Sequence, residues 1–210
     1  MNKKDRTVSV SGALLAIAFA LLLAGRLWAG DDDTNAEKSI KAIGGKVVRD
    51  DKATGKPVIV VDLTNTKVTD AGLKELELAG LKSLQTLSLT GTGVTDAGLK
   101  ELAGFESLQT LDLSLTGVTG AGLKELAGLK SLQTLSLAGP KVTDAGLKEL
   151  AGLKSLQTLG LIGTKVTDAG LKELAGLKSL QTLRLIGTAG VTDAGVAELQ
   201  KALPKCKVLR

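Results

Sequence analysis

The residue types that most often do chemistry are scarce in this chain. It has one cysteine, Cys206, and no histidine, so it can build neither a Ser-His or Cys-His pair nor a histidine-bearing metal site. A single cysteine cannot form an intramolecular disulfide. We interpret Cys206 as a small buried residue, in preference to a reactive or intermolecular thiol. We therefore expect no enzymatic activity.

Two further patterns could bind ions or phosphate, but their spacing is wrong. The acidic runs Asp31–Asp33 and Asp50-Asp51 lack the spaced ligands and central glycine of a calcium-binding loop. The glycines form no GxxxxGK[ST] motif, so they do not predict a phosphate-binding loop. We interpret the acidic runs as linker and turn, and the glycines as turn formers, and we expect no cofactor and no metal.

A repeat dominates the sequence. The segment GTKVTDAGLKELAGLKSLQTL, residues 163–183, recurs with small changes at a period of 24 residues. Six copies align on the leucine that ends each predicted strand: Leu63, Leu89, Leu113, Leu137, Leu161 and Leu185. Extra residues at Glu77-Leu78 and Ala189-Gly190 are predicted to lie in turns. One unit buries too little apolar surface to fold alone, so we expect stability to belong to the stacked array.

Within each unit the apolar spacing changes from strand-like to helix-like. In the second unit, alternating leucines predict a short strand, and wider steps from Val94 to Phe105 predict a helix. Thr95-Asp96 are expected to accept hydrogen bonds from the first free amides of that helix, and Gly104 to end it. Because helices are wider than strands, the stack should curve with its sheet on the concave side.

The segment LQTLSLTGTGVTDAGLKELAG, residues 84–104, resembles a leucine-rich repeat, LxxLxLxxN followed by a variable half. Its VTDAGL part is similar to the ribonuclease-inhibitor-like and cysteine-containing subclasses. The resemblance implies an α/β fold, a right-handed solenoid with a concave parallel sheet, short convex helices, six repeats and terminal caps. This chain departs from the family pattern at the position where the family usually has asparagine or cysteine. The residues at that position here are Thr66, Thr92, Thr116, Pro140, Thr164 and Thr188. Proline has no side-chain hydrogen bond to give, so the fourth turn is predicted to be the weakest.

The first thirty residues do not belong to the repeat. Basic residues precede an apolar stretch from Gly12 to Gly25, and Ala29 stands before Gly30, as in a secretory signal peptide. An uncleaved anchor formed by residues 7–28 and a buried helix are the alternatives. We divide the chain into a signal peptide or anchor (1–29), a linker and N-terminal cap (30–56), the repeat array (57–203) and a C-terminal cap strand (204–210). We expect export to the periplasm or the medium, with membrane contact only through an uncleaved N-terminal segment.

The distribution of charge along the chain argues against nucleic-acid binding. The net charge is +5, but residues 1–29 carry +3 and residues 201–210 carry +4, so the rest of the chain is slightly acidic. With one Trp, two Phe and no Tyr, the chain has almost no aromatic surface on which bases could stack. The basic C-terminal end is interpreted as a protected sheet edge, with contact to anionic lipid or an acidic polymer as the alternative.

The residues that flank the inward leucines should form three columns on the concave face. The first column is uniform, as a structural threonine ladder would be: Thr86, Thr110, Thr134, Thr158 and Thr182. The second column is Asp62, Ser88, Asp112, Ser136, Gly160 and Arg184, and the third is Thr64, Thr90, Ser114, Ala138, Ile162 and Ile186. Variation within otherwise similar copies indicates either partner recognition or drift. The candidate binding residues are Asp62, Ser88, Asp112, Ser136, Arg184, Ile162 and Ile186.

These observations favour a monomeric, non-enzymatic module that binds a protein or an envelope polymer through its concave face. One alternative is a structural spacer of the envelope that has no specific ligand. Another, by family analogy, is a substrate-recognition subunit like those of F-box proteins, which the apparent leader argues against.

Overall fold

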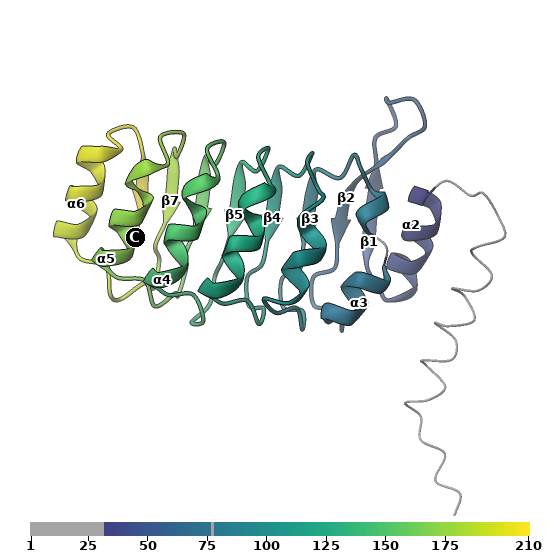
Figure 1. Ribbon diagram of the computed structural model, residues 1–210, viewed down its shortest axis with the longest axis horizontal. Helices are drawn as coiled ribbons and strands as arrows, with labels where there is room; N and C mark the ends of the chain where they lie inside the picture. The colour runs from purple at the N-terminus through teal and green to yellow at the C-terminus, as the bar shows by residue number, and fades with distance from the viewer. Residues whose placement is uncertain (1–31, 77) are drawn as a thin grey trace, which may run out of the picture.

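The computed structural model describes residues 32–210 apart from residue 77, and it is a solenoid in which one sheet is backed by a row of helices (Figure 1). The predicted leader lies outside the described residues. Within the described part of the chain, no helix has the length and apolar character needed to cross a bilayer.

The strands follow one another in chain order across a single eight-stranded sheet. They are β1 (Lys46–Arg49), β2 (Val58–Asp62), β3 (Thr86–Ser88), β4 (Thr110–Asp112), β5 (Thr134–Ser136), β6 (Thr158–Gly160), β7 (Thr182–Arg184) and β8 (Lys207–Leu209). The α-helices are α2 (Asp32–Ala42), α3 (Asp70–Glu75), α4 (Asp144–Leu147), α5 (Asp168–Glu173) and α6 (Asp193–Ala202). The 3₁₀ helices are η1 (Leu78–Gly80), η2 (Gly98–Leu102), η3 (Gly120–Gly128), η4 (Lys148–Gly152) and η5 (Leu174–Gly176).

The core is a set of leucine columns in register. β2 to β8 pair in parallel, and β1 pairs antiparallel with β2. The central leucines of β3 to β7 face one another across the ladder, and each is fully buried: Leu87, Leu111, Leu135, Leu159 and Leu183. The predicted unit of strand, turn and short helix is confirmed, although in the second and third units the helix is entirely 3₁₀.

Different elements cover the two ends of the array. At the N-terminal end lies α2, and the Arg49 side chain on β1 contacts the Glu37 carboxylate of α2 at 2.8 Å. At the other end, β8 adds a parallel strand beside β7, and Cys206 is buried just before it. Burial raises the pKa of the Cys206 thiol, which disfavours the reactive thiolate.

Aspartates join successive units in a way that the sequence analysis did not foresee. Asp96 was expected to cap its own helix, but its two oxygens accept hydrogen bonds from the amide and hydroxyl of Thr119 in the next unit, at 2.7 and 2.6 Å. The same bridge recurs at Asp70–Thr95, Asp144–Thr167 and Asp168–Thr192. Each bridged aspartate therefore ties one repeat to the start of the next.

The glycine of the TDAGL motif makes room for this bridge. A Cβ added to Gly170 would lie 2.3 Å from an Asp144 carboxylate oxygen, closer than real Cβ contacts allow. Gly120 stands where the other units have the bridging aspartate, so Thr143 receives no such bridge. There the backbones come closer, since a Cβ added to Gly146 would lie 2.3 Å from the Gly120 Cα.

A threonine hydroxyl holds the turn in four of the six units. The hydroxyls of Thr66, Thr92, Thr116 and Thr164 each donate to the carbonyl of the leucine three residues earlier, at 2.7 to 2.9 Å. Pro140 has no hydroxyl to donate, and the glycine before it, Gly139, has φ +129°, against +65° and +72° at Gly163 and Gly187. The fourth turn thus differs in backbone conformation as well as in side chain.

Candidate functional site on the concave face

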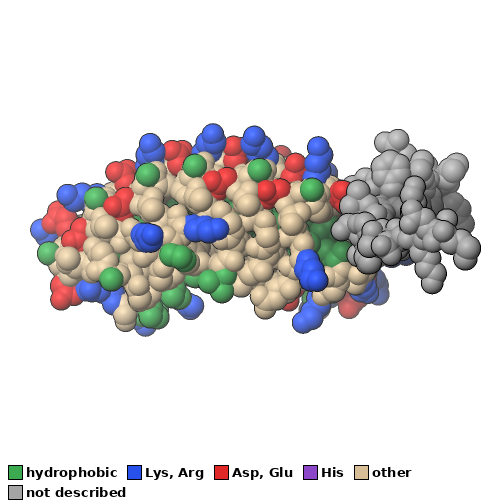
Figure 2. All heavy atoms as spheres, turned by 90° about the horizontal axis from the view of Figure 1, so that it is seen from below, with side chains coloured by type: hydrophobic (Ala, Val, Ile, Leu, Met, Phe, Trp, Pro, Cys, Tyr) green, Lys and Arg blue, Asp and Glu red, His purple; other side chains and the backbone are tan. Residues whose placement is uncertain are grey.

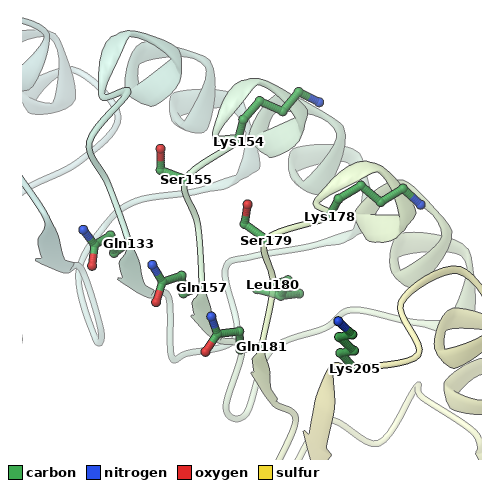
Figure 3. Close-up of a pocket in the computed structure, with 9 residues that line it drawn as sticks. All are labelled: Gln133, Lys154, Ser155, Gln157, Lys178, Ser179, Leu180, Gln181 and Lys205. Atoms are coloured by element: carbon green, nitrogen blue, oxygen red, sulfur yellow. The ribbon is translucent and has the colours of Figure 1, made fainter.

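The strands lie on the inner side of the curve and the helices on its outer side (Figure 3). The parallel register aligns the three predicted columns. It also extends them with residues that the sequence analysis missed. Val48 and Val60 precede the threonines in the first column, whereas Lys207 follows Thr182 and Leu209 follows Arg184.

The first column is not the hydrogen-bonded ladder suggested by its uniformity. Its five threonines are half-buried, and within the described part of the chain their hydroxyls have no hydrogen-bond partner. The side-chain hydrogen bonds of this face lie in the other two columns. The first column therefore presents free donors and acceptors to the concave space.

In the N-terminal half, the candidate residues are engaged by their own neighbours. The Asp62 carboxylate accepts from the Thr64 amide at 2.9 Å, and the Ser88 hydroxyl lies 2.8 Å from the Thr64 hydroxyl. Hydrogen bonding by Thr64, and then the charge of Lys46, lower the pKa of Asp62. Asp112 accepts from the Ser114 amide at 2.9 Å. These side chains complete local turns and have less capacity left for a ligand.

The C-terminal half is free of such bonds. Arg184 is exposed, and within the described part of the chain its guanidinium has no carboxylate within ion-pair distance. Ile162 and Ile186 are 36% and 51% exposed and are neighbours, because the Gly163 amide donates to the Ile186 carbonyl at 2.9 Å. Ser136, on β5, is half-buried. The structure therefore brings together Arg184, Ile162 and Ile186, and it places Asp62, Ser88 and Asp112 in the other half.

Leu115 extends this exposed apolar surface, and the sequence analysis missed it. Its side chain is 67% exposed and its φ is +57°, a left-handed conformation that costs a bulky residue about 1–2 kcal/mol. The Leu115 amide donates to the Ala138 carbonyl at 2.8 Å, and the Gly139 amide to the Ile162 carbonyl at 3.0 Å. We call Leu115, Ala138, Ile162 and Ile186 the apolar row. The sequence does mark Leu115 as unusual, because the other units have Asn65 or a glycine at this position.

Charged and apolar side chains are unevenly distributed over the surface. In Figure 2, blue and red side chains crowd one long margin, and the larger hydrophobic groups lie toward the opposite margin. Within the described part of the chain, no group of three His, Cys, Asp or Glu side chains is arranged to hold a metal ion.

A family model described as Leucine Rich repeat matches residues 80–103, 106–127 and 128–151. Residues 80–151 of this chain therefore contain leucine-rich repeats. The repeats of this family suggest a protein-interaction module, and the resemblance to a leucine-rich repeat inferred from residues 84–104 is confirmed. The ribonuclease-inhibitor-like or cysteine-containing subclass stays a prediction.

One solved structure supports the same assignment, and a second is similar in sequence. A leucine-rich repeat protein of Leptospira interrogans matches with a TM-score of 0.50 and 32% identity, over 63% of this chain and 32% of its own. This chain therefore spans about a third of that protein. Internalin C2 of Listeria monocytogenes matches with a TM-score of 0.48 and 25% identity, over 85% of this chain and 96% of its own. No curated protein sequence matches significantly.

Proposed function

We propose that this leucine-rich repeat protein is an exported interaction module that binds a partner protein through the C-terminal half of its concave face. The observation that carries the proposal is the combination of Arg184 with the apolar row. No other part of the described sheet joins an unpaired guanidinium to several exposed branched apolar side chains.

The composition of this surface is what protein interfaces use at their energetic centres. Arginine and large apolar side chains carry much of the binding energy when they are desolvated, whereas small hydroxyl residues contribute little. The strained backbone at Leu115 supports the same reading. A sterically costly and exposed leucine gains nothing for folding from its exposure, and such strain is typical of functional surfaces.

Affinity capture from envelope and secreted fractions tests this proposal. The bait proteins are the intact chain, a variant with Ile162, Arg184 and Ile186 replaced by alanine, and a matched control with Ser88 and Thr90 replaced by alanine. We expect a protein that is retained by the intact chain and the control and lost by the first variant. With that partner in hand, calorimetry should show that Arg184→Ala weakens binding by about 1–3 kcal/mol and Ser88→Ala by much less.

Other outcomes would assign a different role. Equal retention by all three baits would move the site away from this surface, and retention of a polysaccharide would favour an envelope polymer as the ligand. If nothing is retained specifically, the spacer alternative holds.

Export is proposed on the leader-like sequence of residues 1–29. Mass spectrometry of the protein from its native host is expected to find a mature N-terminus at Gly30. A full-length chain recovered only with membranes would support the anchor formed by residues 7–28, and a full-length chain in the cytosol would exclude both.

A further inference from the structure

A cleft of about 490 Å³ lies at the N-terminal ends of β5 to β8, at the end of the strands opposite to the apolar row. It is lined by three glutamines and three lysines in addition to serines and one leucine: Gln133, Gln157, Gln181, Lys154, Lys178 and Lys205. In Figure 3 the glutamines form a row beneath Ser155 and Ser179, Lys205 lies at one end, and the Lys154 and Lys178 side chains extend from the rim toward the helices, with their ammonium groups pointing away from the row.

The glutamine side chains are available because the backbone bonds of these residues are already made. The Gln157 amide donates to the Gln133 carbonyl, and the Gln181 amide to the Gln157 carbonyl, both at 2.8 Å. Within the described part of the chain, no hydrogen bond involves the carboxamides of these three glutamines or the hydroxyls of Ser155 and Ser179. Each carboxamide offers both a donor and an acceptor, as a peptide group requires.

The cleft is positively charged and has no carboxylate among its lining residues. β5, β6, β7 and β8 contain no Asp or Glu, and Lys207 and Arg184 continue the positive charge across the sheet. Lys178 is held in place, since its ammonium donates to the Ala202 carbonyl at 3.2 Å. By contrast, the neighbouring cations Lys201 and Arg210 are already paired with Glu198 and Asp193.

The absence of aromatic rings restricts the class of anionic ligand. The only aromatic ring within the described residues is that of Phe105, which is buried in the core, so the cleft offers no face on which bases or sugar rings could stack. What the cleft does offer is a row of amides with Lys205 at one end and two further lysines, Lys154 and Lys178, on its helix-side rim. Carboxylates and extended backbone amides complement these groups.

We propose that this cleft binds an acidic, extended segment of polypeptide from a partner protein. The carboxylates of the segment contact Lys154, Lys178 and Lys205, and its backbone amides bond to the glutamine carboxamides. The site goes beyond the proposed function, because its lining residues include neither Arg184 nor any member of the apolar row. The two surfaces can therefore be tested separately.

Fluorescence anisotropy with a labelled peptide of alternating glutamate and serine tests the proposal on the mature chain. We expect saturable binding that weakens with salt. Lys154→Glu combined with Lys178→Glu and Lys205→Glu should weaken it by roughly tenfold or more, as the loss of three exposed charge pairs would. The matched control reverses three lysines on the convex helices, Lys100, Lys124 and Lys148, and should keep most of the affinity.

Two further measurements separate a peptide site from general attraction of anions. Replacing Gln133, Gln157 and Gln181 by alanine should weaken the glutamate peptide severalfold but leave binding of dextran sulfate unchanged, since that polymer has no peptide groups. Replacing Lys154 and Lys205 by glutamine, which leaves the Lys178 contact to α6 intact, should weaken the peptide too, with an unchanged melting curve.

Several results would overturn the proposal. These are equal losses in the cleft and convex variants, equal binding of a lysine-serine peptide, binding only to phosphatidylserine vesicles, or no effect of the glutamine substitutions. A variant with Ile162 and Ile186 replaced by alanine, which keeps Arg184, should bind the probe normally. If that variant loses the captured partner and the intact chain does not bind the probe at all, the proposed function is upheld and the acidic-peptide site is refuted.

Discussion

Threonines that link the repeats and threonines of the concave first column have opposite roles. Thr119 and Thr167 at the starts of helices are bound at 2.6 Å by an aspartate of the preceding unit. Thr134 and Thr158, on the inner side of the same array, recur at the same period, but within the described part of the chain their hydroxyls bond to nothing. Periodicity therefore does not distinguish a structural threonine from one that is free for a ligand. Only the hydrogen-bond partner of the hydroxyl distinguishes the two kinds of threonine.

The same contrast separates the two halves of the concave face. Asp62 and Asp112 are held by the residues two positions later, whereas Arg184 and the isoleucines are not. In this array, polar groups that complete a turn belong to the scaffold, and groups without partners mark the candidate binding surfaces. The following predictions test that division, from the largest expected effect to the smallest.

Leu135→Asp is expected to have the largest effect on stability. Leu135 is fully buried between Leu111 and Leu159, so a carboxylate there would lose its hydration without gaining a partner. We expect a loss of at least several kcal/mol in the free energy of unfolding, about 3 or more. Circular dichroism should show most ordered structure lost, or proteolysis should leave a fragment of two or three units. An unchanged melting curve would show that the register is wrong.

Gly120→Asp tests whether the missing bridge can be restored. The repeat pattern alone predicts that an aspartate at residue 120 stabilises the chain by binding Thr143. The structure predicts the reverse, because a Cβ at residue 120 would lie 2.7 Å from the Gly146 Cα. We expect a loss of about 1–3 kcal/mol from overpacking, measured by denaturant unfolding. A gain in stability would mean that the two backbones separate at little cost.

Asp144→Ala removes an existing bridge between the fourth and fifth units. Its carboxylate bonds to both the amide and the hydroxyl of Thr167, so we expect a loss of about 1–2 kcal/mol in the free energy of unfolding. Asp144→Asn should recover part of the loss, because an amide oxygen can still accept one of these hydrogen bonds.

Thr158→Val is the matched control on the concave side. The threonine hydroxyl has no partner within the described part of the chain, and valine suits a strand as well as threonine does. We expect a change within about 0.5 kcal/mol. A loss as large as that of Asp144→Ala would show that the first column supports the fold after all, and would remove the contrast between the two sets of threonines.

The sequence was sufficient for everything that depends on the repeat. A period of 24 residues and the LxxLxL pattern predicted the strand, the turn, the helix and the parallel register, because a unit that cannot bury its apolar face alone must stack in phase with its copies. The pattern also predicted that Arg184, Ile162 and Ile186 share one face. The position of Val48 on that face was missed because β1 is antiparallel and lies outside the repeat, whereas Val60 lies in the first unit and was missed because it is not a threonine.

What only the tertiary structure decided is which polar groups have partners. Asp96 fits the capping pattern of its own helix, yet its oxygens bind Thr119, and only the distance between neighbouring units determines that choice. Leu115 looks like an irregular turn residue in sequence, and its exposure depends on how the turn packs beside Gly139. The repeat fixes which side chains are aligned because alignment follows from the period. Hydrogen bonding and exposure follow from spacing between units, which a linear pattern does not contain.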